Sequence, residues 1–337
     1  MKGLLYTAPL HVEVQSLPEP EAEPHEVLIR VSACGVCGSD VHGFQGKSRI
    51  RVPPMVMGHE FGGRVVLSGR VDLETGQRVV VQPVVGCGQC TYCWNGTPNI
   101  CPNRELIGGQ RQGAFAEYVR APAHLVYPVS DALSDIACTL VEPLGNAVHM
   151  LRLGGGALDR DVVVLGAGTL GLMTVGLARV AGARRIMVTD VDAGRLAVAR
   201  CLGADETLEV GTEGVIERIL RLTSGGAQLV IDAAGFTTSR RQAIAVAAPG
   251  STVVLLGLSD PTSELPIADV INREIVVRGS YSSTDADFRH AISVLEAKKI
   301  DTESWVRPAL LEEGQACFES LALHQSDIVK VVFTLAQ

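Results

Sequence analysis

Two rhythms of hydrophobic positions divide the chain. Up to about residue 147, short runs rich in valine, isoleucine and leucine alternate with turn residues, as in 25–33 and 62–69. Such runs predict short β-strands of a partly closed antiparallel domain. Beyond residue 148 the apolar runs are uninterrupted, are bounded by Gly or Asp, and are separated by stretches of helical character. This second pattern predicts parallel strands that are covered on both faces.

The second pattern contains six predicted strands: 161–168, 185–190, 206–210, 228–235, 251–258 and 274–281. With helices between them, they predict a doubly wound sheet. An amphipathic helix is predicted at 287–300 and a final strand at 328–335, which we expect to return to the first domain. The expected domains are therefore 1–147 together with 282–337, and 148–281.

The composition narrows the class of protein. The 337 residues carry a net charge of −8, with Lys and Arg dispersed along the chain, which argues against nucleic-acid binding. Two long uncharged segments, 162–178 and 242–259, are broken by glycines or a Pro-Gly pair, so no membrane span is expected. Nine cysteines without a secretory signal predict a cytoplasmic chain that binds metal and has no disulfide scaffold.

A glycine-rich turn follows the first of the parallel strands. Gly166, Gly168 and Gly171 form a G-x-G-x-x-G pattern which, with Thr169 and Leu170, opens a helix. The first glycine permits the turn, the second lets a pyrophosphate approach the backbone, and the third lets helix and strand pack closely. The pattern predicts a dinucleotide site at the helix N-terminus; a nucleotide-free sheet with chance glycines is the alternative.

The end of the next strand predicts the choice of dinucleotide. Asp190 lies there, and a carboxylate in this place accepts hydrogen bonds from the adenosine ribose and repels a 2′-phosphate. NAD is therefore predicted over NADP. Arg195, a helical turn later, is a counterweight among the candidate cofactor residues, although we expect it to face solvent.

Four cysteines are clustered at about residues 84–104. Cys87, Cys90, Cys93 and Cys101 have the spacing C-x2-C-x2-C-x7-C, with glycines between them. Four thiolates at this spacing predict a closed tetrahedral Zn²⁺ site, which leaves no position for a substrate and is therefore structural. An iron–sulfur cluster and redox-labile thiols are the alternatives.

Further candidate ligands lie in the segments 34–44, 58–63 and 141–149. With the four cysteines and the glycine-rich turn, these segments occur in an order that resembles the zinc-dependent medium-chain dehydrogenases over essentially the whole chain. The polyol (sorbitol) and L-threonine dehydrogenase branch is the most similar. The resemblance implies a GroES-like, partly open β-barrel as catalytic domain and a Rossmann domain for the cofactor.

Carried over by position, the resemblance makes Cys37 the thiolate ligand and His59 the imidazole ligand of a catalytic zinc. Glu142 stands where the ethanol-type enzymes have a cysteine, and Glu60 is a carboxylate that this branch can move onto the metal. Cys138 is a second candidate, but the family match favours Glu142. A plain helix-start carboxylate is the alternative for Glu142, and direct or water-mediated binding is left open. Two zinc ions per chain are thus implied.

Three neighbouring residues complete the implied site. Asp40 is the expected partner of His59, fixing the tautomer of its ring, with turn capping as the alternative. Ser39 is expected to contact the substrate oxygen and to begin a proton path. His42 would pass that proton to bulk water, unless it is only a surface histidine.

The implied function is hydride transfer between a secondary alcohol, of polyol type, and NAD. L-threonine 3-dehydrogenase activity and an aldehyde or ketone reductase working in reverse are alternatives in the same class. A non-catalytic nucleotide-binding paralogue is the alternative of another class. The resemblance also implies a homo-oligomer, dimer or tetramer, and the apolar strand at 274–281 is a candidate edge for pairing.

Overall fold

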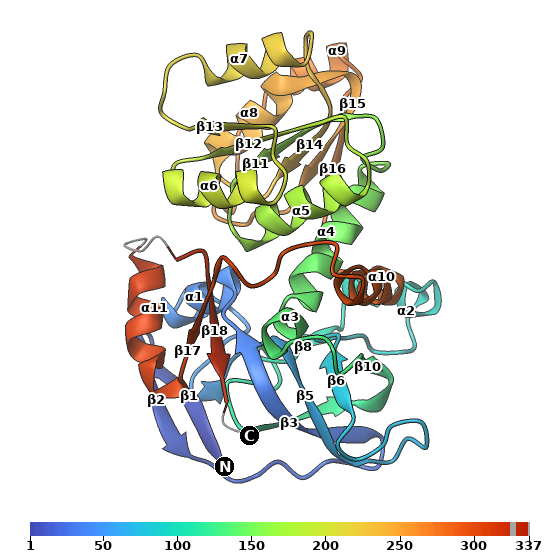
Figure 1. Ribbon diagram of the computed structural model, residues 1–337, viewed down its shortest axis with the longest axis vertical. Coiled ribbons are helices and arrows are strands. Elements are labelled where there is room, and N and C mark those ends of the chain that lie inside the picture. Colours follow the sequence, from blue (N-terminus) through green and yellow to red (C-terminus); the bar gives the residue numbers. More distant parts are fainter. Residues whose placement is uncertain (324–327, 336–337) are drawn as a thin grey trace. The chain divides into compact units, whose positions relative to one another are not determined.

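The computed structural model describes residues 1–323 and 328–335 (Figure 1). The chain forms two compact units, each described by itself. Unit 1 comprises Met1–Glu142, Thr284–Lys298 and Thr302–Gln337, and unit 2 comprises Pro143–Ser283 and Lys299–Asp301.

Unit 1 is built mainly on antiparallel strands. Its largest sheet has seven strands in the order β10-β6-β5-β3-β18-β17, with β9 also paired to β3; the smaller sheets are β2-β1-β4 and β7-β8. The strands are β1 (Lys2–Ala8), β2 (His11–Ser16), β3 (Glu26–Gly35), β4 (Met55–Val56), β5 (Glu60–Ser68), β6 (Arg78–Val81), β7 (Val84–Val85), β8 (Glu105–Leu106), β9 (Tyr118–Pro122), β10 (Val126–Pro128), β17 (Val306–Ala309) and β18 (Lys330–Thr334). This confirms the predicted GroES-like fold class.

The final strand, β18, joins the main sheet of unit 1 between β3 and β17. β18 pairs antiparallel with β3, with Phe333 opposite Cys34, so the end of the chain lies beside one of its earliest strands. The predicted return of this strand is confirmed. In the core of unit 1, Phe333 meets Phe115 edge-to-face with ring centroids 5.2 Å apart, and Phe44 stacks on Phe318 at 5.2 Å. Such aromatic pairs each stabilise by about 0.5–1.5 kcal/mol beyond their burial.

The helices of unit 1 are short, except for α10. They are α1 (Gly38–Phe44), α2 (Thr91–Trp94), α3 (Asp135–Thr139), α10 (Asp285–Glu296) and α11 (Gly314–Ala322). α10 is the predicted amphipathic helix, with Phe288 and Leu295 buried. Thr284 caps it, because its hydroxyl accepts a hydrogen bond from the Asp287 amide. α4 (Val141–Leu153) runs from the end of unit 1 into unit 2.

Unit 2 is a doubly wound sheet. All six strands are parallel and follow the order β13-β12-β11-β14-β15-β16, so each of the six predicted strands is confirmed. They are β11 (Asp161–Leu165), β12 (Arg185–Asp190), β13 (Glu206–Glu209), β14 (Ala227–Asp232), β15 (Ala247–Leu255) and β16 (Val276–Gly279). The order reverses between β11 and β14, which is where such sheets bind dinucleotides.

Helices cover both faces of this sheet, with α5 and α6 on one face and α7, α8 and α9 on the other (Figure 1). Their bounds are α5 (Thr169–Val180), α6 (Ala193–Cys201), α7 (Val215–Leu222), α8 (Thr237–Val246) and α9 (Ile267–Asn272). Because both faces are covered, the central strands are mostly apolar, and all five residues of β11 are buried. Among the described residues, no helix is both long and apolar enough to cross a membrane.

Candidate functional site

The first candidate ligand is fixed by the start of a helix. Cys37 precedes α1 in an extended conformation (φ −91°, ψ 153°), and its amide donates to Asp40 Oδ2 at 3.0 Å. This bond satisfies an amide that the helix leaves unpaired. The Cys37 side chain is thereby held just beyond the end of β3.

Sheet pairing brings the other ligands to the same place. β3 and β5 are antiparallel neighbours with Gly35 opposite Glu60, so Cys37 and His59 lie at adjacent strand ends. Cys37, His59 and Glu60 each offer a ligand atom, and these three atoms all lie within 4.8 Å of one another. A thiolate, an imidazole and a carboxylate at such separations fit a Zn²⁺ ion with a fourth position left over.

The remaining predicted ligand lies outside this group of three. Glu142, in the first turn of α4, is buried, but among the described residues it does not share the 4.8 Å grouping. Cys138 is also outside the group, in α3, where burial raises the pKa of its thiol to about 11. Cys34, on β3, is fully buried, and burial raises the pKa of its thiol well above the usual value.

Asp40 lies between two buried side chains, His59 and Arg51. Its Oδ1 lies 3.3 Å from His59 Nδ1 and accepts a hydrogen bond from Arg51 Nε at 3.0 Å. Burial alone would raise the pKa of Asp40, but His59 and Arg51 lower it to about 2. The carboxylate therefore stays charged and directs Nδ1 of His59 toward itself, which leaves Nε2 for a metal. Asp40 is at the same time a capping residue, so the two alternatives for it coexist.

Glu60 has a buried cation of its own. Lys330 on β18 is 1% exposed; its Nζ donates to Glu60 Oε2 and, at 3.0 Å, to the carbonyl oxygen of Val36. Burial alone would lower the pKa of Lys330, but the Glu60 carboxylate raises it. Because Lys330 compensates Glu60 and Arg51 compensates Asp40, a bound divalent cation would be offset mainly by the Cys37 thiolate.

The two candidate proton carriers differ in exposure. Ser39 is half-buried, and its Oγ accepts a hydrogen bond from Arg51 Nη2 at 2.9 Å. His42, one turn further along α1, is exposed. Partial burial of its ring and the charges of Lys47 and Arg51 lower the pKa of His42, so its imidazole is neutral at pH 7 and able to accept a proton.

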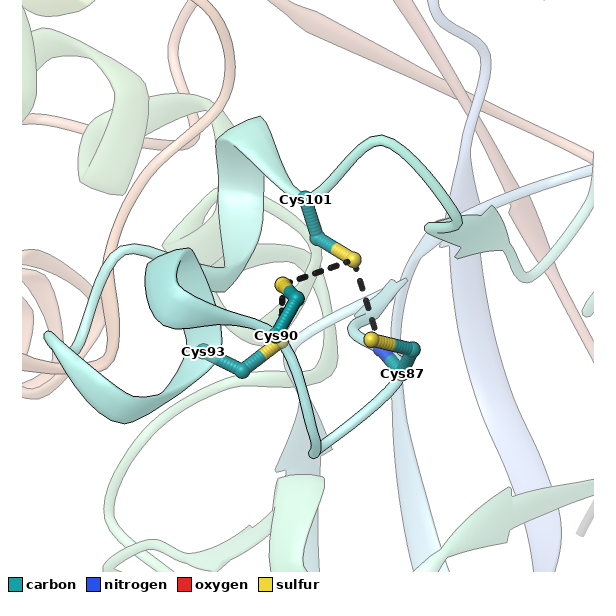
Figure 2. A group of neighbouring side chains, drawn as sticks. All are labelled: Cys87, Cys90, Cys93 and Cys101. Atoms are coloured by element: carbon teal, nitrogen blue, oxygen red, sulfur yellow. Dashed lines mark hydrogen bonds between the residues drawn. The ribbon is translucent and has the colours of Figure 1, made fainter.

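The four predicted lobe cysteines form a second group (Figure 2). Cys90 Sγ lies 3.5 Å from Cys93 Sγ and 3.6 Å from Cys101 Sγ, and the Cys87 amide donates to Cys101 Sγ at 3.5 Å. Disulfide sulfurs are ~2.05 Å apart, whereas sulfurs around a tetrahedral Zn²⁺ with ~2.3 Å bonds are about 3.8 Å apart. The observed spacing fits a metal ion enclosed by four thiolates.

The glycine-rich turn has the geometry of a phosphate cradle. Gly166 has φ +98°, and a Cβ on Gly171 would lie 1.9 Å from the Gly166 carbonyl oxygen, so neither position accepts a side chain. Gly168 precedes α5, and a Cβ there would meet nothing within 4 Å. Thr169 and Leu170 form the first turn of α5. Open space at a helix N-terminus suits a pyrophosphate.

Asp190 supports this turn. At the end of β12, its Oδ2 accepts from the Ala167 amide at 2.6 Å and its Oδ1 accepts from the Asp192 amide at 3.0 Å. A carboxylate has about four acceptor positions, so two are left for ribose hydroxyls. Arg195 was expected to face solvent, but its side chain is only 25% exposed. Its Nε lies 4.0 Å from Oδ2 of Asp192, the N-cap of the same helix, α6.

Two family models match the chain: an alcohol dehydrogenase GroES-like domain over residues 23–131 and a zinc-binding dehydrogenase domain over residues 169–297. A sorbitol dehydrogenase from Halalkalibacterium halodurans is 30% identical over 332 residues, covering 96% of each chain. The chain belongs to the zinc-type medium-chain dehydrogenase family. The resemblance inferred from the sequence motifs is thereby confirmed.

Other relatives in the zinc-type medium-chain dehydrogenase family have different names. An L-threonine 3-dehydrogenase from Bacillus licheniformis is 36% identical over 270 residues, or 78% of this chain and 76% of that one. The crystal structure of a zinc-binding dehydrogenase from Sinorhizobium meliloti 1021 bound to NADP has a TM-score of 0.93 and 31% identity, and it covers 99% of both chains. The family therefore includes both polyol and amino-alcohol enzymes.

Sequence reasoning missed Arg51 and Lys330. A lysine between the apolar residues Val329 and Val331 is a signal that could have been noticed, because a charged residue within an apolar strand needs a buried partner. Arg51 lies in a polar, basic segment and carries no comparable signal.

Proposed function

We propose that this protein oxidises a secondary alcohol of polyol type, with transfer of the hydride to NAD. The observation that carries the proposal is the convergence of Cys37, His59 and Glu60, a group of three ligands where the cysteine lobe has four. When bound there, zinc supplies a Lewis acid that stabilises negative charge on the substrate oxygen. Unit 1 would be the catalytic domain and unit 2 the cofactor domain.

The chain's own residues would bind and move the proton. Ser39, at the start of α1, would hydrogen-bond the reacting oxygen, and His42 on the exposed side of the same helix would release the proton to water. Glu142 is proposed as a further ligand, direct or through water. All nine cysteines are free of disulfides, which supports the cytoplasm as the compartment in which the protein acts.

A panel of substrates tests the proposal: sugar alcohols, inositols, 2,3-butanediol and L-threonine, each with NAD and followed by NADH absorbance. Zinc content is measured on the same sample. Turnover of a polyol with two zinc ions per chain is expected. L-threonine 3-dehydrogenase activity is the second candidate, since relatives of that name are 36% identical. One zinc and no turnover of any substrate would leave the non-catalytic paralogue.

Asp190→Ala is expected to raise the KM for NAD at least about 10-fold, because a charged acceptor contributes about 1.5–3 kcal/mol. The preference for NAD over NADP should fall, since the charge that repels a 2′-phosphate is removed. KM for both cofactors measures this. Glu264→Ala, an exposed carboxylate of unit 2, is the matched control. An unchanged ratio between the two cofactors would contradict the proposed role.

We also propose that two copies pair along β16. This strand is the end of the parallel sheet, all four of its residues are exposed, and Val276 and Val277 are 43% and 37% exposed. An unpaired apolar edge favours pairing with another chain. Val277→Lys is expected to shift the protein to monomer in sedimentation velocity, and Val71→Lys, at a fully exposed position elsewhere, is not. A Val277→Lys variant of unchanged size would exclude this interface.

A further inference from the structure

Arg51 is a buried arginine at the edge of the candidate catalytic group, and only 4% of it is exposed. The turn before it is fixed, because the Ser48 hydroxyl accepts hydrogen bonds from the amides of Ile50 and Arg51 at 3.3 and 3.2 Å. This turn directs the Arg51 side chain toward α1. Burying a guanidinium is costly unless its donors are paired, so its partners define its role.

Helix α1 leaves space for the Arg51 side chain at Gly43. A Cβ on Gly43 would lie 2.5 Å from Arg51 Cδ and 3.1 Å from Arg51 Cβ, so the guanidinium reaches its position only because residue 43 is glycine. Asp40 lies three residues before Gly43 on the same face of α1, and its Oδ1 accepts a hydrogen bond from Arg51 Nε at 3.0 Å. The space and the charge for Arg51 are therefore both supplied by α1.

Two nitrogens of the Arg51 guanidinium, Nε and Nη2, have different partners. Nη2 donates to Ser39 Oγ at 2.9 Å and lies 3.4 Å from His59 Nδ1, while Nε donates to Asp40. A guanidinium can only donate, so the Ser39 oxygen accepts and the Ser39 proton has to point away from Arg51. Nδ1 of His59 also needs an acceptor, and Asp40 Oδ1 lies within reach of both His59 Nδ1 and Arg51 Nε. The hydrogen bond from Arg51 therefore holds in place the oxygen that orients His59.

We propose that Arg51 is the positioning residue of this site: it orients the Ser39 hydroxyl as a donor toward the reacting oxygen and, through Asp40, holds the His59 ring toward the metal. The inference rests on the proposed function, and it adds to it a residue that touches neither substrate nor metal. Lys330, by contrast, pairs with the candidate ligand Glu60 and has no hydrogen bond to Ser39 or Asp40 among the described residues.

Arg51→Gln is expected to lower kcat about 10- to 100-fold and to weaken metal binding at the catalytic group by a similar factor, as for other partners of metal ligands. KM should change much less, because Ser39 acts on the developing charge. Arg51→Lys, which keeps the charge and one donor, should recover part of both losses. Arg307→Gln, an exposed arginine of unit 1 paired with Glu313, is the matched control and should change neither.

The readouts are steady-state kinetics, chelator competition for the metal, and the visible spectrum of the cobalt-substituted protein, which reports ligand geometry without turnover. Ser39→Ala separates the two roles. In that background Arg51→Gln should lower kcat by less than about 3-fold while still weakening metal binding, because coupled residues are not additive. An equal loss of kcat in both backgrounds would overturn the proposal.

A purely structural role predicts a different result: a lower melting temperature of Arg51→Gln with kcat, metal affinity and cobalt spectrum unchanged, which would overturn the inference. Should Arg51→Gln not fold, Gly43→Ala displaces the guanidinium while favouring the helix, and it should lower kcat and metal affinity in the same way. If the wild type oxidises no alcohol, the proposed function fails, whereas a weakened cobalt affinity of Arg51→Gln would still support the metal arm.

Discussion

Replacing Cys37 by serine should abolish alcohol oxidation, with a loss of at least about 10³-fold, while the cysteine lobe keeps its metal. The expected size follows from the several kcal/mol that a Lewis acid contributes to a transition state, since each 1.4 kcal/mol is tenfold in rate. Zinc content should fall from two ions to one per chain. Turnover and metal analysis on the same sample measure both effects.

The control for Cys37→Ser is a second cysteine. Cys138 is buried in α3, outside the group formed by Cys37, His59 and Glu60, so Cys138→Ala should retain two zinc ions and most of the activity. A Cys37→Ser protein with undiminished turnover would refute the proposed catalytic centre. Loss of one zinc from Cys138→Ala would instead identify Cys138 as the ligand.

Lys330→Met is expected to destabilise the protein by about 3–5 kcal/mol. The side chains of Lys330 and Glu60 are 0% and 2% exposed, so removing the lysine leaves a buried carboxylate without its cation. Urea denaturation at a fixed zinc concentration measures the loss. Lys2→Met, which breaks the exposed pair with Glu312, should have little effect.

A double substitution tests the reason for the Lys330→Met effect. In Glu60→Gln/Lys330→Met both charges are replaced by neutral groups of similar size, so most of the stability should return. If the single and double variants are equally unstable, packing of the lysine chain, and not its charge, is what stabilises unit 1. If Lys330→Met unfolds at the wild-type urea concentration, the buried pair contributes nothing measurable.

The parallel sheet was predictable because its signal is local. The central strands of unit 2 are buried on both faces, which favours an uninterrupted apolar run such as those of β11 and β12. The glycine-rich turn was predictable for a related reason: Gly171 has no room for a Cβ, so the residue type itself records the close approach of two backbone segments.

The surroundings of the candidate cofactor and metal-binding residues were less predictable. Arg195 was expected to face solvent, yet its side chain is only 25% exposed and lies beside Asp192, the N-cap of its own helix. Glu142 was assigned as a ligand by position in the family alone, and in the structure it lies in the first turn of α4, outside the group formed by Cys37, His59 and Glu60. Distances between side chains on different elements follow from packing, which no periodicity in the sequence records.

By itself, the sequence determined the two fold classes, the four-cysteine lobe, the glycine-rich turn and the family, because each of these needs particular residue types at short spacings. Only the tertiary structure decided which buried charges face one another. Lys330 reaches Glu60 from a position 270 residues away because β18 pairs beside β3, and Arg51 reaches Asp40 because Gly43 leaves room for it. A buried cation needs a carboxylate partner from another segment, and only the packing of the folded chain brings the two together.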